Sequence, residues 1–231
     1  MPNWCENELT VTGPVGAVDQ FLADIADGDH PISFNKVLPI PQSIRDASSG
    51  SDESSHKSLF GEGLKFSFTE EAPEDYVSDH LVGEYEGWRV KELNNTLWRH
   101  LKELTPEERK GYVQRQEDLA LAYKNNVDRY GHTSWYGWSI ANWGCKWDAI
   151  KGCVIRNEVS PKGRTKTATI SFSTPWGPPT QVIHEIIVRN PSLRFASRFW
   201  EGGMAFKGVI KGKGGEVTHE ESSPYSGSRG G

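Results

Sequence analysis

The feature that most restricts the fold of this sequence is a β-α-β pattern at each end of the chain. Residues 6–12 alternate apolar and polar side chains, as a half-buried strand does. Apolar side chains then recur at helical spacing, which predicts an amphipathic helix over residues 15–26. Residues 32–38 predict a second extended segment, which Pro39 and Pro41 end.

The C-terminal part has the same order of elements. Its patterns predict strands at 153–159 and 167–173, a helix from Pro178 to Asn190, and strands at 193–200, 204–211 and 216–219. A Rossmann fold is excluded because no Gly-x-Gly-x-x-Gly follows a strand. The sequence therefore predicts an α+β, ferredoxin-like two-layer sandwich, with helices on one face of an antiparallel or mixed sheet.

The segment between the two patterns predicts a helical insertion over residues 74–131. Apolar residues between 90 and 104 form one stripe, and Thr105-Pro106-Glu107-Glu108 then has the pattern of a capping box. Two helices joined so closely predict an antiparallel hairpin.

These patterns divide the chain into four parts. Residues 1–73 form the N-terminal part of the sandwich, with a mobile loop at 46–58 and a brief strand at 64–68. The other parts are the insertion (74–131), the C-terminal part of the sandwich (132–219) and a disordered tail (220–231).

Charge and composition limit the function classes. The formal net charge of −5 argues against a protein whose whole surface serves nucleic acid, although it allows a local basic stripe. No apolar run is long enough to span a membrane, and the N-terminus lacks the pattern of a signal peptide, so we expect a cytosolic protein. The three cysteines fit neither a disulfide framework nor a zinc site, so we expect reduced thiols. No cofactor or metal is expected.

Several motifs resemble those of the YubB-like ferredoxin-fold family of phages and conjugative plasmids. They are Asn3-Trp4-Cys5-Glu6-Asn7, Phe34-Asn35-Lys36-Val37-Leu38-Pro39-Ile40-Pro41, Trp143-Gly144-Cys145-Lys146-Trp147-Asp148 and Phe172-Ser173-Thr174-Pro175-Trp176-Gly177. Two positions depart from the family pattern, Pro175 and Gly203. The family has no established catalytic mechanism. The resemblance therefore implies a non-enzymatic accessory protein of a mobile genetic element that binds a host protein, as a counter-defence inhibitor does.

The aromatic segment 132–148 supplies the first candidate site. Trp143 and Trp147 could form a slot for a planar ligand such as a small nucleotide, with Lys146 and Asp148 as polar anchors. The same tryptophans could instead fill the core of the sandwich. The candidate binding residues are Trp135, Trp138, Trp143, Lys146, Trp147, Asp148, Trp176 and Glu201.

A second candidate site lies on the late strands, where basic residues alternate with apolar ones. Ferredoxin-like sheets bind single-stranded nucleic acid through exposed aromatic side chains with basic neighbours. A solvated outer sheet face would explain the same alternation. The candidate residues are Arg194, Arg198, Lys207 and Lys211.

No catalytic constellation is complete. A Cys145–His132 nucleophile pair would lack a third residue to orient the base, and nothing in the sequence brings Glu201 close to Asp148. The sequence does not predict the oligomeric state.

Overall fold

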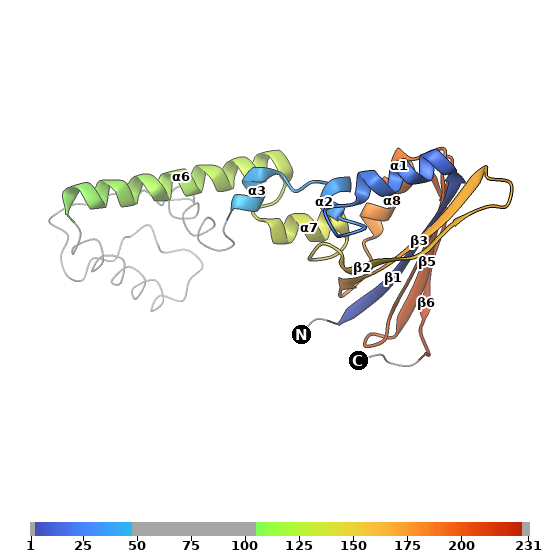
Figure 1. Cartoon of the computed structure of the whole chain (residues 1–231). Coiled ribbons are helices and arrows are strands. Elements are labelled where there is room, and N and C mark those ends of the chain that lie inside the picture. Colours follow the sequence, from blue (N-terminus) through green and yellow to red (C-terminus); the bar gives the residue numbers. More distant parts are fainter. Residues whose placement is uncertain (1–2, 48–104, 228–231) are drawn as a thin grey trace. The chain divides into compact units, whose positions relative to one another are not determined.

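The computed structural model describes residues 3–47 and 105–227 (Figure 1). It divides the chain into two compact units. One unit comprises Met1–Pro41 and Tyr136–Gly231, and the other comprises Gln42–Trp135. Three predictions lie outside the described residues, wholly or for the most part. They are the strand at 64–68, the first helix of the hairpin with its apolar stripe at 90–104, and the loop at 46–58.

The larger unit is built on one antiparallel sheet, with six strands among the described residues, in the order β2-β3-β1-β4-β5-β6. β1 pairs with both β3 and β4, so it occupies the middle of the sheet. The order along the chain, β1-α1-β2-β3-α8-β4, is the ferredoxin-like arrangement, with β5 and β6 added beside β4. The strands are β1 (Trp4–Pro14), β2 (Ile150–Val159), β3 (Thr165–Pro175), β4 (Arg194–Glu201), β5 (Phe206–Lys213) and β6 (Glu216–Pro224).

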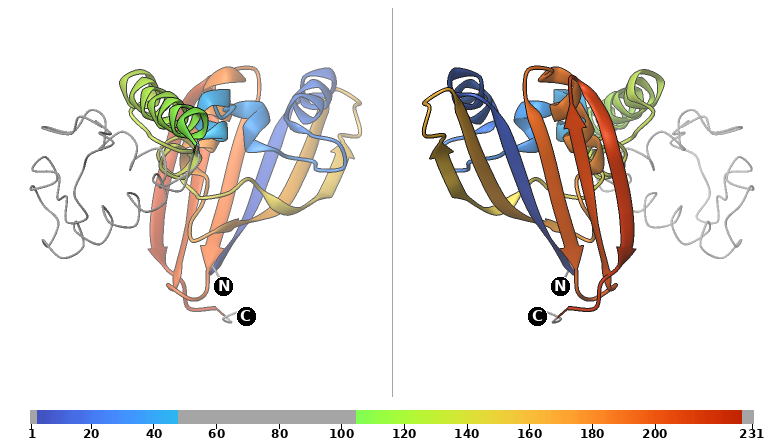
Figure 2. Two further views of the ribbon diagram at one scale, coloured as in Figure 1. Left: turned by 90° about the vertical axis from the view of Figure 1, so that its left-hand side faces the viewer. Right: turned by 90° about the vertical axis from the view of Figure 1, so that its right-hand side faces the viewer.

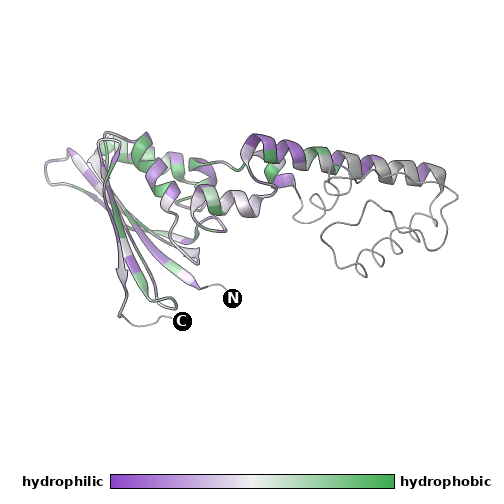
Figure 3. Cartoon of the chain, turned by 180° about the vertical axis from the view of Figure 1, so that it is seen from behind, coloured by the Kyte–Doolittle hydropathy of each residue, from purple (hydrophilic) through white to green (hydrophobic). Residues whose placement is uncertain are grey.

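The helices α1 (Val15–Ile25) and α8 (Thr180–Arg189) cover one face of this sheet (Figure 2). α1 contacts β1 and β3, and α8 contacts β4, β5 and β6. β1 and β4 therefore bury alternate side chains under the helices and turn the others to the opposite face, which we call the open face. Apolar stretches mark the helices and strands that form this core (Figure 3). The predicted α+β ferredoxin-like fold is confirmed.

The predicted extended segment at 32–38 is wrong. Residues Phe34–Val37 form the short helix α2, in which Phe34 and Val37 are both buried. The cause lies far away in the sequence, because the carboxylate of Asp148 accepts hydrogen bonds from the Phe34 backbone N–H at 2.6 Å and from the Ser33 hydroxyl at 2.7 Å. The strand that completes the opening β-α-β unit is β2, which follows the smaller unit in the chain.

The prediction of a tail from residue 220 is also wrong in part. β6 extends to Pro224 because Glu220 and Glu221 pair with Ile210 and Val209 of β5. The segment is polar on both faces, so no apolar alternation in the sequence marked it as a strand.

In the smaller unit, α6 (Pro106–Tyr130) begins at the predicted capping box. The Thr105 side chain accepts from the Glu108 backbone N–H, and the Glu108 carboxylate accepts from the Thr105 backbone N–H. α3 (Gln42–Asp46) packs on α6, with the Asn126 side chain donating to the Ser43 carbonyl at 3.0 Å. Among the helices that the structure describes, none is both long and apolar enough to cross a membrane.

Candidate functional site

Basic side chains gather on the open face of β4 and β5. The register places Trp200 opposite Lys207, Arg198 opposite Val209, and Ala196 opposite Lys211. Because paired residues of antiparallel strands share a face, these side chains all lie opposite the helices. Arg194 and Lys213 form one more such pair. The fold therefore brings all four predicted basic residues onto one surface, with Lys213 as a fifth.

The five cations of this surface are exposed and unpaired. No ion pair joins any of them to a carboxylate within residues 3–47 and 105–227. Four acids share the open face with them: Glu8 is the cross-strand neighbour of Arg198, Glu6 of Trp200, Glu216 of Lys213 and Glu221 of Val209. Glu6 accepts instead from the Ser173 hydroxyl at 2.9 Å. The positive charges are thus free to meet an anion from solution.

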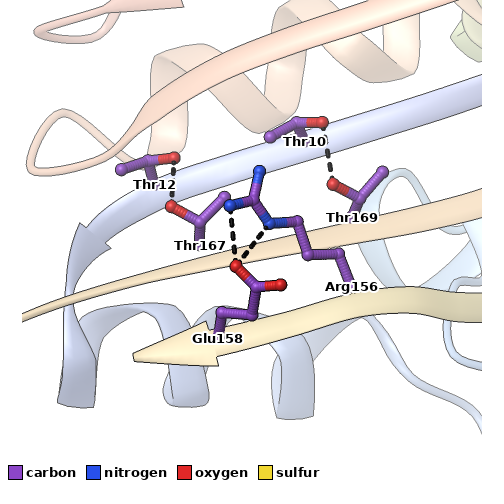
Figure 4. A network of polar contacts seen from close by, with 6 residues as sticks. All are labelled: Thr10, Thr12, Arg156, Glu158, Thr167 and Thr169. Carbon is purple, nitrogen blue, oxygen red and sulfur yellow. Dashed lines mark hydrogen bonds and ion pairs between the residues drawn. The ribbon is translucent and has the colours of Figure 1, made fainter. Parts of the chain in front are cut away.

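The other half of the open face differs, because its polar groups are satisfied by one another (Figure 4). Thr10 and Thr169 are joined by a hydrogen bond of 3.0 Å, and Thr12 and Thr167 by one of 3.1 Å. The Arg156 guanidinium donates twice to one carboxylate oxygen of Glu158, at 3.0 and 2.7 Å. This half therefore offers fewer unpaired groups to a ligand than β4 and β5 do.

A groove of about 280 Å³ lies over β4, β5 and β6. Two cross-strand rows line it, Trp200–Lys207–Ser223 and Arg198–Val209–Glu221. Tyr225 lines it as well, and the Tyr225 backbone N–H donates to the Ala205 carbonyl at 2.7 Å, which holds this residue beside the β4–β5 turn. The groove thus combines two half-buried aromatic side chains with two of the exposed cations.

The sheet beneath the groove is closely packed. Gly208 lies on the helix side of β5, where an added Cβ would come within 2.3 Å of the Phe199 ring and 2.5 Å of the Glu221 carbonyl. Phe199 in turn packs edge-on against Phe206, with 6.2 Å between ring centroids. This packing holds the backbone that carries Arg198, Trp200 and Lys207.

The predicted tryptophan slot is occupied by the protein itself. Trp143 is only 3% exposed, and its Nε1 donates to the Leu38 carbonyl at 2.8 Å. Its ring packs edge-on against Phe34 and Trp138, which is also buried. These contacts agree with the core alternative for Trp143 and Trp138.

Asp148 also acts within the fold. Besides its bonds to Ser33 and Phe34, its Oδ1 accepts from the Ala149 backbone N–H at 2.8 Å. This carboxylate therefore caps α2 and does not present a free anchor to a ligand.

Other residues of the aromatic segment lie at the surface. Trp147 is 38% exposed and packs against Trp4, with 6.5 Å between ring centroids. The Lys146 ammonium lies over two rings, 4.7 Å from the centroid of Trp147 and 5.1 Å from that of Tyr136. The lysine is thus engaged in cation–π contacts. Trp135 is half-buried at the start of α7 (Trp135–Trp143).

Trp176 is half exposed and adopts a left-handed backbone conformation, with φ of 70°. Its backbone N–H donates to the Asn3 carbonyl at 2.9 Å, and this bond closes the end of the β1–β3 pair. A non-glycine residue in this region carries strain that the surrounding bonds must offset.

Glu201 is buried and holds the β4–β5 turn. Its carboxylate accepts from the backbone N–H groups of Gly203, at 2.6 Å, and Met204. Burial, followed by the charge of Glu201, raises the pKa of the nearby Cys5 thiol from its ordinary value of 9.0 to about 12. Burial likewise raises the pKa of Cys145. Neither buried thiol is a nucleophile at neutral pH.

The structure adds groove residues that the sequence interpretation missed, namely Trp200, Val209, Glu221, Ser223 and Tyr225. Trp200 alternates with Arg198 and so could have been assigned to the basic face. Val209 alternates with Lys207 and Lys211 and could have been assigned in the same way. Glu221, Ser223 and Tyr225 could not, because the predicted last strand ended at residue 219. Within the described ranges, no group of three or more His, Cys, Asp or Glu side chains could hold a metal ion.

Comparisons with known proteins give one family and one structure. Residues 143–228 match a family model described as a ferredoxin-like domain in Api92-like protein. The crystal structure of the protein api92 from Yersinia pseudotuberculosis aligns with 99% of this chain and 99% of its own, at 13% sequence identity and a TM-score of 0.47. A search of curated proteins gave no significant match.

Proposed function

We propose that this chain binds single-stranded nucleic acid on the open face of β4, β5 and β6. The observation that carries the proposal is the row of exposed, unpaired cations on β4 and β5, in a chain whose net charge is −5. Keeping unpaired positive charges together on one face costs free energy through repulsion between them, and an anionic ligand would remove that cost.

The spacing of the cations suits a phosphate backbone. Side chains at alternate positions of one strand lie about 7 Å apart. Each successive cross-strand pair on the open face of β4 and β5 carries at least one cation, in the order Lys207, Arg198, Lys211, and then Arg194 with Lys213. An extended polyanion lying along the strands can therefore contact several of them at once, and it releases its bound counterions as it does so.

The groove supports a single strand over a duplex. Unstacked bases can stack on aromatic side chains, and each such contact contributes about 1–3 kcal/mol. Trp200 and Tyr225 line the groove together with Arg198 and Lys207, so a base can reach them only when it is turned out of a helix. Elsewhere the acidic surface repels the ligand, which restricts binding to this face.

Fluorescence anisotropy with labelled 12-nucleotide strands of RNA and DNA tests the proposal. We expect binding at low salt, with log K falling against log salt concentration at a slope of about −2 to −3.5, as for three to five phosphate contacts on a single strand. Arg198→Glu and Lys207→Glu should each weaken binding at least about tenfold, because each reverses a charge at the groove.

Lys162→Glu provides the matched control. Lys162 is exposed in the turn between β2 and β3, away from the groove, and the substitution changes the net charge by the same amount. Absence of binding at low salt would overturn the proposal, as would an equal loss of affinity in the control variant.

The biological role of the chain is a separate proposal, which rests on the motif resemblance. That resemblance supports a YubB-like accessory protein of a phage or plasmid, acting in the host cytoplasm against a host protein such as a defence component. Affinity purification of the tagged chain from a bacterial lysate, followed by native mass spectrometry, tests it. A stoichiometric host protein would support a protein target, and co-purified nucleic acid alone would support the sheet face.

A further inference from the structure

The groove contains one acidic side chain among its cations. Glu221 lies opposite Val209 on β5, in the row that begins with Arg198. Its side chain is 64% exposed, and its Oε2 lies 3.4 Å from the Nε2 of His219, its neighbour on the same face of β6. No ion pair joins Glu221 to Arg198 or Lys207, although all three line the same groove.

A carboxylate in a site for polyanions opposes binding unless it recognises a part of the ligand. An ionised carboxylate only accepts hydrogen bonds. In nucleic acid, the phosphates and the acceptor atoms of the bases repel Glu221. The groups that attract it are the 2′-hydroxyl of ribose, which every RNA nucleotide carries and which gives no preference among bases, and the N–H donors on the edges of the bases, which differ from base to base.

Guanine is the base whose edges fit both signs of charge in the groove. Its Watson–Crick edge places two donors side by side, N1–H and the exocyclic N2 amino group, which match the two oxygens of a carboxylate. Its O6 and N7 are acceptors that suit an arginine or a lysine. Adenine and cytosine pair their one amino group with a ring acceptor, and uracil offers a single N–H between two carbonyl oxygens.

The size of the groove agrees with one base. Its volume of about 280 Å³ lies just below the range of about 300–1,000 Å³ for sites that hold drug-sized ligands, which are larger than a single base. Two aromatic residues, Trp200 and Tyr225, line the groove, and Ser223 adds a hydroxyl to the lining.

We infer that the groove is a guanine-selective subsite within the proposed single-strand interface, with Glu221 as the residue that determines the specificity. The inference rests on the proposed function. In this arrangement the Glu221 carboxylate accepts from N1–H and N2–H of guanine, Arg198 and Lys207 contact its acceptor edge or the adjoining phosphates, and an aromatic side chain stacks on the ring.

The test compares four labelled 12-nucleotide RNA strands by fluorescence anisotropy at one low salt concentration. Three strands alternate uracil with guanine, adenine or cytosine, and the fourth contains uracil alone. The full-length chain should bind the guanine-containing strand at least about fivefold more tightly than the other three, since a bidentate base contact is worth at least that factor.

Glu221→Gln is the decisive variant, because a glutamine keeps the shape of the side chain but replaces one acceptor with a donor. We expect its preference for guanine to fall below about twofold, with uracil-strand binding unchanged or tighter. Glu216→Gln removes the same charge from β6 outside the groove and should keep the preference.

The outcomes separate the inference from the function on which it rests. Equal binding of all four strands, a preference for adenine or cytosine, or an unchanged guanine preference in Glu221→Gln would overturn the guanine subsite alone. No binding of any strand at low salt would overturn the proposed function and the subsite together.

Discussion

Asp148 and Phe34 are 114 residues apart in the chain, and the Oδ1 of Asp148 accepts the Phe34 backbone N–H at 2.6 Å. The same carboxylate accepts from the Ser33 hydroxyl at 2.7 Å. The segment between them includes all of the smaller unit, Gln42–Trp135. The bond therefore links two segments of the ferredoxin-like unit, one that precedes the smaller unit in the sequence and one that follows it.

Replacing Asp148 should destabilise the protein. Asp148→Ala removes the acceptor for the first backbone N–H of α2, and loss of a helix cap costs about 0.5–2 kcal/mol. Urea denaturation followed by circular dichroism measures the free energy of unfolding. Asp29→Ala, at an exposed aspartate of the same unit, is the control and should change stability by less than about 0.5 kcal/mol. Equal stability of both variants would show that the cap contributes nothing.

Trp143→Phe should reduce stability by about 1–3 kcal/mol. The substitution leaves the Leu38 carbonyl without its donor and opens space between Phe34 and Trp138. Trp147→Phe changes a ring that is 38% exposed, so we expect a loss below about 0.5 kcal/mol. Thermal denaturation of the two variants measures the difference. If Trp143→Phe kept full stability, the core assignment of this tryptophan would be wrong.

The order of the main elements could be predicted because their patterns are local. Leu9 and Val11 alternate in β1, Phe21 and Ile25 lie a helical turn apart in α1, and Thr105 caps α6 with residues next to it in sequence. These signals need no information about distant residues.

The rest of the fold depended on distant contacts. Ile32 and Phe34 alternate as in a strand, whereas Phe34 and Val37 have the spacing of a helix, and Asp148 decides between the two. β6 carries no apolar face of its own and is ordered only by pairing with β5. The groove was missed for the same reason, since Glu221, Ser223 and Tyr225 come from that region.

The two glycines Gly208 and Gly16 should respond in opposite ways to alanine. Gly208→Ala would place a Cβ within 2.3 Å of the Phe199 ring, and overpacking of this kind costs about 1–3 kcal/mol. Gly16 lies in α1 with no atom within 4 Å of an added Cβ, so Gly16→Ala should stabilise the protein by about 0.5–1 kcal/mol. Chemical denaturation gives both values. A stable Gly208→Ala variant would contradict the close packing beneath the groove.

Stability should fall as the pH rises above about 9. Burial and then the charge of Glu201 raise the pKa of Cys5 from 9.0 to about 12, and burial raises the pKa of Cys145, so both thiols stay protonated in the folded state after the unfolded chain has lost these protons. The unfolded state then binds fewer protons, and each thiol lowers the free energy of unfolding by about 1.4 kcal/mol per pH unit.

Urea denaturation at pH 8, 9 and 10 measures this dependence. The double variant Cys5→Ala/Cys145→Ala should show a flatter profile between pH 9 and 10, whatever its stability at pH 8. Cys153→Ala is the control because Cys153 is exposed, and its profile should match that of the unsubstituted protein. An unchanged slope in the double variant would show that these thiols do not control the alkaline limit.

The groove residues all come from one continuous stretch, Arg198 to Tyr225, which forms three successive strands joined by short turns. β1, β2 and β3 and the helix α1 contribute nothing to its lining. In evolution, the ligand preference of this face can therefore change through substitutions in one short segment, while the remainder of the domain keeps its sequence. For protein engineering, the open-face positions of this stretch can be randomised, while its buried residues Phe199, Glu201 and Ile210 are kept because they belong to the core.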